Sequence, residues 1–169
     1  MKIPTVQDIM VREVISVRPD TPVIEAYEVL SKYNFDGVPV VDAENHLVGI
    51  VTDYDLIVKG SSLHLPTFQK ILSELPVYQK DRGAFRKEIQ ELQDMRVRDV
   101  MNADPLTLPD NAPFEKVIAE FRDHHRVNPI PVIDKDRKVV GVVSRYDVIK
   151  LFSLVGPESD SLIEKEIIK

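Results

Sequence analysis

The sequence predicts an α+β protein built from two copies of one β-α-β-β-α unit. The first observation is an internal repeat, because Val6-Gln-Asp-Ile-Met10 returns as Val97-Arg-Asp-Val-Met101. The second is that Gly49-Ile-Val-Thr-Asp-Tyr-Asp55 returns 92 positions later as Gly141-Val-Val-Ser-Arg-Tyr-Asp147. A duplicated unit folds similarly twice and usually packs on its own copy. We therefore expect two pseudo-symmetric repeats packed sheet to sheet, with ligand sites in the cleft between them.

Each repeat begins with a strand-like run and a helix. In the first copy the run Val14–Val17 ends at a turn whose Thr21 is expected to cap a helix with Pro22 at its first position. Apolar residues then recur at helical spacing, as Val23, Ala26, Tyr27 and Leu30 and, after Pro113, as Phe114, Val117, Ile118 and Phe121.

Two short strands and a second helix follow in each repeat. The apolar runs are closed by an aspartate and a turn, which is typical of β-hairpins. After each hairpin the periodicity returns to the helical one. The predicted strands are Val38–Val41, Leu47–Val51, Ile130–Ile133 and Val139–Val143, and the predicted second helices are Asp55–Val58 and Asp147–Phe152.

The stretch between the repeats has no counterpart in the second half. From Thr67 onward apolar residues fall at helical spacing, and Pro76 interrupts them, so we expect two helical pieces. The favoured interpretation is a linker that packs its apolar stripe on its own domain, and a dedicated partner surface is the alternative. The predicted organisation is repeat 1 at residues 1–60, a helical insertion at 61–96, repeat 2 at 97–155 and a C-terminal tail at 156–169.

Composition excludes several classes of function. With 22 basic and 28 acidic residues the net charge is -6 and the pI about 5.2, so the chain lacks the basic field that a nucleic-acid binder needs. Cysteine is absent, which excludes disulfides and thiolate metal sites and fits a reducing compartment. No apolar run approaches the length that spans a bilayer. We therefore expect a cytoplasmic protein with no membrane or nucleic-acid partner.

The order of these landmarks resembles the cystathionine-β-synthase (CBS) domain family. The resemblance rests on Asp-Ile-Met, an apolar-Pro-Val-Val-Asp strand and Gly-Ile-Val-Thr-x-x-Asp before a helix, and it covers residues 6–58 and 97–152. The duplication resembles the tandem pair called a Bateman module. The resemblance implies a regulatory module that binds AMP, ADP, ATP or S-adenosylmethionine, and stand-alone pairs of this family often form disc-shaped dimers.

A hydroxyl and a carboxylate recur at the end of each hairpin and are candidates for holding a ribose. Thr52 and Asp55, like Ser144 and Asp147, lie three residues apart across a strand-to-helix junction. An ionised aspartate only accepts hydrogen bonds and suits two adjacent ribose hydroxyls. Capping of the following helix by Thr52 and Ser144 is the other interpretation, and it is compatible with binding.

The resemblance also implies a flat apolar slot for the adenine base, read by backbone groups. Each site would be shared, so that Asp147 serves a base held mainly by the first repeat and Asp55 one held mainly by the second. Ordinary core packing is the alternative for most of these residues. The implied slot residues are Ile15, Ser16, Gly37, Val38 and Pro39 in one repeat and Leu106, Thr107, Asn128, Pro129, Ile130 and Pro131 in the other.

The phosphate end departs from the family pattern. Members that bind AMP or ATP tightly often place a cation before the apolar-Pro strand, whereas this chain has Asp36 and Asn128 there. Compensation is expected from Arg145, between Ser144 and Asp147, or from His124, His125 and Arg126 ahead of the second strand. Arg145 is the best candidate, and a solvated surface arginine is its alternative. A neutral or cationic adenosine ligand such as S-adenosylmethionine stays open.

Enzyme activity is not expected, because the chain has no phosphate-binding loop, zinc-binding His-Glu-x-x-His or Gly-x-Ser-x-Gly motif. No metal site or cofactor is expected either, apart from the adenosine ligand. The function predicted is a ligand-sensing regulatory module that acts on an effector protein in trans, and a constitutive dimerisation scaffold is the alternative. A homodimer is expected because six helix residues exceed what one interior needs, namely Val23, Ala26, Leu30, Phe114, Val117 and Phe121.

Overall fold

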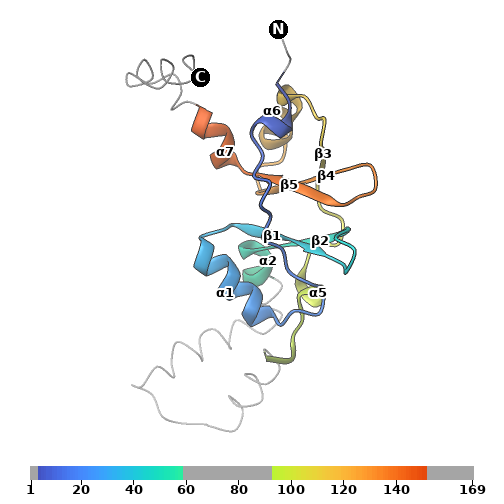
Figure 1. The fold of residues 1–169 in the computed structure, drawn as a ribbon. Coiled ribbons are helices and arrows are strands. Elements are labelled where there is room, and N and C mark those ends of the chain that lie inside the picture. The colour runs from blue at the N-terminus through green and yellow to red at the C-terminus, as the bar shows by residue number, and fades with distance from the viewer. Residues whose placement is uncertain (1–3, 59–92, 152–169) are drawn as a thin grey trace, which may run out of the picture. The chain divides into compact units, whose positions relative to one another are not determined.

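The computed structural model describes residues 4–58 and 93–151, which form two compact units (Figure 1). The first unit holds residues 15–58, 93–105 and 136–139, and the second holds 4–14, 106–135 and 140–151. Helices and short strands alternate in both, so the predicted α+β class is confirmed. The insertion helices and the tail that we predict lie outside the described residues.

The first unit is built on a hairpin of β1 (Gly37–Val41) and β2 (Leu47–Thr52), which pair antiparallel. Helices α1 (Val23–Tyr33) and α2 (Asp53–Val58) lie on the same side of this hairpin (Figure 1). One cluster of buried apolar residues joins Val17 to α1, both strands and α5 (Val97–Val100). Its other members are Val23, Ala26, Leu30, Val38, Val40, Val51, Val97 and Val100.

The second unit repeats this plan with a three-stranded sheet in the order β3-β4-β5. Strand β3 pairs parallel to β4. Its elements are η1 (Val6–Asp8), β3 (Leu108–Pro109), α6 (Phe114–Asp123), β4 (Ile130–Ile133), β5 (Val139–Val143) and α7 (Arg145–Ile149).

The short helical turn that opens each sequence repeat lies in the unit built mainly from the other repeat: α5 in the first unit and η1 in the second. In the first unit Ile50 of β2 and Asn102 exchange backbone hydrogen bonds of 3.0 and 2.9 Å, which anchors the segment after α5. In the second unit Val11 and Val142 exchange backbone hydrogen bonds of 2.8 and 3.0 Å in the same way. The compact units therefore do not coincide with the sequence intervals of the repeats.

Two predictions at the start of the first repeat differ from the structure. Thr21 does not cap α1: Pro22 is the N-cap residue, and Thr21 Oγ1 accepts the backbone N–H of Arg18 at 3.0 Å. The hydroxyl thus closes the preceding turn, and no side chain caps the helix. Of the predicted first strand only Val17 pairs, in a parallel bridge with Val40, because the chain turns directly afterwards.

The prediction that helix residues form a surplus apolar surface is wrong for most of the residues named. Val23, Ala26 and Leu30 are at most 6% exposed, so they belong to the core. Val117 and Phe121 in α6 are also buried, and Phe114 is half-buried. The large apolar residues of α1 and α6 that are exposed are instead Tyr27, Tyr33 and Ile118.

Candidate functional site

The first unit ends its hairpin in a closed set of hydrogen bonds around Asp55. Oδ2 of Asp55 accepts the Thr52 hydroxyl at 2.7 Å and the Thr52 backbone N–H at 3.1 Å. In return Thr52 Oγ1 accepts the backbone N–H of Asp55 at 3.2 Å. Asp55 is only 6% exposed, and these bonds satisfy part of the acceptor capacity of a buried carboxylate.

The second unit repeats the arrangement with Ser144 and Asp147. Oδ2 of Asp147 accepts the Ser144 hydroxyl at 2.6 Å and its backbone N–H at 2.8 Å, and Ser144 Oγ accepts the N–H of Asp147 at 3.3 Å. Ser144 is the N-cap of α7, so the capping interpretation is confirmed there. Within the residues that the structure describes, every hydrogen bond recorded for this carboxylate involves Oδ2, which leaves Oδ1 available to a ligand.

The caps also explain where the second helices begin. We predict helix starts at Asp55 and Asp147, but α2 begins at Asp53 and α7 at Arg145. A cap residue directly precedes the first helical residue, and its carboxylate partner stands three positions after the cap. The helices therefore start two residues earlier than their aspartates.

The implied base-slot residues lie along the sheets, and their burial limits what they offer. Val38 and Ile130 are at most 1% exposed, so both belong to the core and neither side chain reaches the surface. The Pro39 carbonyl already accepts the Val17 N–H at 3.0 Å. Pro131 is buried in β4, and Gly37 is the first residue of β1. Four more slot residues are half-buried in the segments just before Val17 and Leu108, namely Ile15, Ser16, Leu106 and Thr107.

In both units a residue just before β1 or β4 accepts a hydrogen bond from the backbone N–H of the first residue of the second helix. The Asp36 backbone carbonyl accepts the Asp53 N–H at 2.9 Å. In the second unit Asn128 does this with its side chain, because Oδ1 of Asn128 accepts the Arg145 N–H at 3.0 Å. Asp36 and Asn128 thus each accept the N–H of the first residue of the second helix in their unit.

Arg145 is held against the end of α6. Its Nη2 donates to the carbonyl oxygens of His124 and His125 at 3.0 and 2.8 Å, and its guanidinium lies 5.3 Å from the centre of the Phe121 ring. Arg145 is thus a half-buried arginine whose guanidinium is held by the end of α6. Sequence spacing does not predict these contacts, since they join residues about 20 positions apart.

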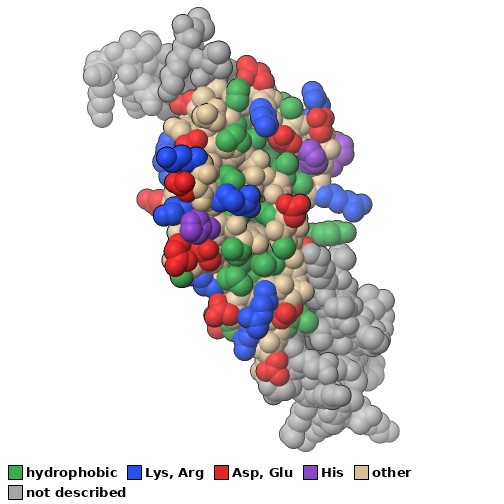
Figure 2. Space-filling view, turned by 90° about the vertical axis from the view of Figure 1, so that its right-hand side faces the viewer, with side chains coloured by type: hydrophobic (Ala, Val, Ile, Leu, Met, Phe, Trp, Pro, Cys, Tyr) green, Lys and Arg blue, Asp and Glu red, His purple; other side chains and the backbone are tan. Residues whose placement is uncertain are grey.

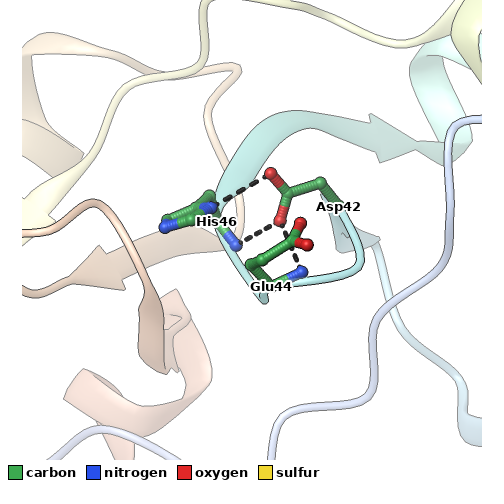
Figure 3. A group of neighbouring side chains, drawn as sticks. All are labelled: Asp42, Glu44 and His46. Carbon is green, nitrogen blue, oxygen red and sulfur yellow. Dashed lines mark hydrogen bonds and ion pairs between the residues drawn. The ribbon is translucent and has the colours of Figure 1, made fainter.

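A group of potential metal ligands lies in the turn between β1 and β2 (Figure 3). Ligand atoms of Asp42, Glu44 and His46 all lie within 4.8 Å of one another. Asp42 uses both carboxylate oxygens inside the turn, accepting the Glu44 and His46 N–H groups at 3.1 and 2.8 Å and contacting His46 Nδ1 at 3.0 Å. The N–H of His46 is the main group that holds the pKa of Asp42 below its ordinary value. These bonds make the group a turn-closing set.

The surface of the described residues carries both signs of charge. On the face drawn in Figure 2, the Lys and Arg side chains are interspersed with Asp and Glu. No helix in the described part of the chain has the length and apolar character needed to cross a bilayer.

Comparison with known proteins places these observations in a family. CBSX1, a chloroplastic CBS domain-containing protein of Arabidopsis thaliana, is 31% identical over 138 residues, which are 79% of this chain and 57% of that protein. Inosine-5'-monophosphate dehydrogenase of Methanocaldococcus jannaschii is 27% identical over 143 residues, 85% of this chain but 22% of the enzyme. The chain thus spans between about a fifth and three fifths of these two relatives.

A solved structure supports the same assignment. The crystal structure of CBSX2 in complex with AMP is 27% identical and superposes with a TM-score of 0.65, covering 89% of this chain and 97% of that one. The sequence model of the CBS domain matches twice, at residues 6–61 and 97–154, over the stretches that carry the two capping sets. The chain therefore belongs to the CBS domain family, as a tandem pair.

Proposed function

We propose that this chain is a regulatory module that binds an adenosine-containing ligand and signals its occupancy to another protein. The observation that carries the proposal is the carboxylate of Asp147. Its Oδ2 closes the cap of α7, and none of the hydrogen bonds recorded among the described residues involves Oδ1. Because the cap holds this carboxylate in place and leaves its Oδ1 available, it suits a ligand that presents hydroxyl donors.

A ribose meets this requirement best. An ionised aspartate accepts but does not donate, and a ribose offers two adjacent hydroxyls as donors. The bond is charge-assisted and therefore stronger than one between neutral groups. The recurrence of the same carboxylate at Asp55 supports a second position of this kind, and the AMP bound in the CBSX2 structure supports adenosine as the nucleoside.

The charge around Arg145 favours an anionic ligand at the Asp147 carboxylate. The guanidinium is fixed by two carbonyl oxygens and an aromatic ring, and no carboxylate is among the partners recorded for it in the described residues. A fixed cation beside a ribose-binding carboxylate attracts a phosphate attached to the same nucleoside. AMP, ADP and ATP are therefore the preferred ligands, and S-adenosylmethionine is the competing one.

The remaining parts of the proposal concern partners and location. We expect no catalytic activity of this chain on its own, because the capping sets use their hydroxyls and carboxylates to close helices rather than to activate a nucleophile. A second copy of the chain and an effector protein acting in trans are the proposed partners, and the cytoplasm is the proposed location.

The test is a calorimetric titration of the full chain with AMP, ADP, ATP and S-adenosylmethionine. Saturable binding of at least one phosphate-bearing nucleotide is the expected result, with weaker binding of S-adenosylmethionine. Tighter binding of S-adenosylmethionine would overturn the assignment of Arg145. Absence of binding by all four ligands would overturn the proposal and favour a constitutive dimerisation scaffold.

A further inference from the structure

A groove of about 370 Å³ lies between α1 and α2 of the first unit. Apolar side chains from both helices line it, and two of them, Tyr27 and Ile57, keep 60% and 64% of their surface exposed. Large apolar side chains gathered at a hollow are typical of a surface that another molecule covers.

The wall of the groove beyond the end of α1 is held in place. Asn34 ends the helix in the left-handed conformation, at a φ of 54°, and its N–H donates to the Ser31 carbonyl at 3.4 Å. The N–H of Phe35 donates to the Leu30 carbonyl at 2.9 Å, and the Phe35 ring stacks on Tyr33 with 5.4 Å between the ring centres. The groove is therefore preformed, and a wall that is already ordered loses little conformational entropy on binding.

Negative charge in the groove restricts what binds there. Asp36 and Asp53 are the described lining residues that carry charge at neutral pH. The Asp53 N–H donates to the Asp36 carbonyl at 2.9 Å, so both acidic residues lie in the same part of the groove. Asp53 is exposed, and the hydrogen bond recorded for its carboxylate comes from the neutral N–H of Tyr54, at 2.7 Å. A matching partner therefore presents positive charge beside its apolar side chains, whereas nucleic acid and anionic membranes are repelled.

The second repeat lacks this negative charge at the corresponding positions. The helix α6 begins 91 residues after α1, and α7 begins 92 residues after α2. Asn128 thus corresponds to Asp36, and Arg145 corresponds to Asp53. A cationic partner is attracted at the first position and repelled at the second, so the charge difference gives the chain one docking surface rather than two equivalent ones.

The helical walls of the groove favour a helix over an extended peptide as the partner. An extended peptide binds by adding a strand to the edge of a sheet, for which it needs open backbone N–H and C=O groups. Within a helix these groups bond to one another. A partner helix instead lays a stripe of apolar side chains, three and four positions apart, between the two walls.

We propose that this groove receives an amphipathic helix of the effector protein, with lysine or arginine beside its apolar stripe. The inference rests on the effector in trans proposed above and adds where that protein docks and which chemistry it presents. The apolar stripe packs on Leu30, Phe35 and Ile57, and a basic side chain at its margin pairs with the exposed carboxylate of Asp53.

A synthetic helix tests the groove in the nucleotide-free full chain. The probe is a fluorescent peptide of about 15 residues, long enough to form a helix, with leucine on one face and lysine on the other. Its control has glutamate in place of every lysine. In fluorescence anisotropy we expect saturable binding of the lysine peptide, and binding of the glutamate peptide that is weaker by about tenfold or more.

Two pairs of variants separate the groove from the rest of the surface. Asp53→Lys reverses the charge of the groove, and Glu115→Lys makes the same change at an exposed position of α6. Ile57→Ser removes an apolar contact, and Ile149→Ser does so at the corresponding position of the second repeat, which is 61% exposed. We expect Asp53→Lys and Ile57→Ser each to bind the lysine peptide about tenfold more weakly, and both controls to bind it as the wild type does. Circular dichroism and the thermal midpoint check that all four variants are folded.

Four results would each overturn the proposal. A wild type that does not bind the lysine peptide would show a groove that is closed by this chain, filled by a second copy or without affinity for such a helix. Equal binding of the two peptides would leave the charge without a role. Equal losses in Asp53→Lys and Glu115→Lys would reduce the binding to general attraction between unlike charges, and equal losses in Ile57→Ser and Ile149→Ser would place the peptide outside the groove.

Nucleotide titration of the same protein keeps this proposal apart from the one on which it rests. Peptide binding without nucleotide binding would overturn the sensing role and keep the docking groove. Nucleotide binding without peptide binding would remove the groove alone.

Discussion

Replacing Asp147 by alanine separates the two roles that this carboxylate combines. The substitution removes both hydrogen bonds to Ser144, at 2.6 and 2.8 Å, and the oxygen that is left for a ribose. Loss of a helix cap costs about 1 kcal/mol, which corresponds to a fall of about 2–4 °C in Tm for a chain of this size. Loss of a charge-assisted hydrogen bond to the ligand costs about 1.5–3 kcal/mol, or roughly a 10- to 150-fold weaker Kd.

The matched control is Ser144→Ala, which weakens the same cap but keeps the carboxylate. Calorimetric titration with AMP, together with thermal unfolding, is measured for both variants and the wild type. We expect similar losses of stability in the two variants, and a large loss of affinity only in Asp147→Ala. A folded Asp147→Ala protein that binds AMP as tightly as the wild type would refute the ribose assignment, and equal losses of affinity in both variants would reduce Asp147 to a helix cap.

The geometry leads to three further predictions. Gly49→Ala should lower the free energy of unfolding by about 2–3 kcal/mol and Gly141→Ala by about 1 kcal/mol, measured by urea unfolding. A Cβ at Gly49 meets a backbone carbonyl oxygen at 2.8 Å, whereas the closest contacts of a Cβ at Gly141 are with a flexible methionine side chain. Equal losses of stability in the two variants would contradict this reasoning. Arg145→Glu should weaken ATP binding about tenfold more than adenosine binding in calorimetry, since only phosphates respond to the charge, and equal losses would remove Arg145 from the phosphate site. Asp42→Ala should destabilise the protein at neutral pH, and the difference in stability between wild type and variant should shrink as the pH falls below about 4. The pKa of Asp42 is lowered in the folded state, so the carboxylate stabilises the fold above its unfolded pKa. This stabilisation is lost as the pH falls through the folded pKa. Thermal unfolding across pH checks this, and a difference that grows in acid would contradict it.

The hairpins and second helices could be predicted because their signals are local. β4 (Ile130–Ile133) and β5 (Val139–Val143) begin and end where the apolar runs do, since each run is bounded by turn residues. The capping sets are also visible as Thr52 with Asp55 and Ser144 with Asp147, because a cap needs a fixed spacing of three residues. Features that one short segment determines are therefore recoverable from one sequence.

Other features depend on contacts that the sequence spacing does not reveal. The exchange of opening turns joins Ile50 to Asn102 through backbone hydrogen bonds, which any residue types can make. The fixation of Arg145 by two carbonyl oxygens is hidden for the same reason. Thr21 matches a helix-cap signal, but the turn before the helix offers its hydroxyl the Arg18 N–H instead. Gly49 is a local clue to the exchange, because a side chain there would collide with the incoming segment.

Ribose binding by the carboxylate of Asp147 is tested most directly by comparing AMP with 2'-deoxy-AMP in calorimetry, in the wild type and in Asp147→Ala. We predict that removal of the 2'-hydroxyl weakens binding to the wild type about tenfold or more and has little effect on the variant, because the hydroxyl and the carboxylate form one bond. Equal binding of the two nucleotides to the wild type would contradict this assignment.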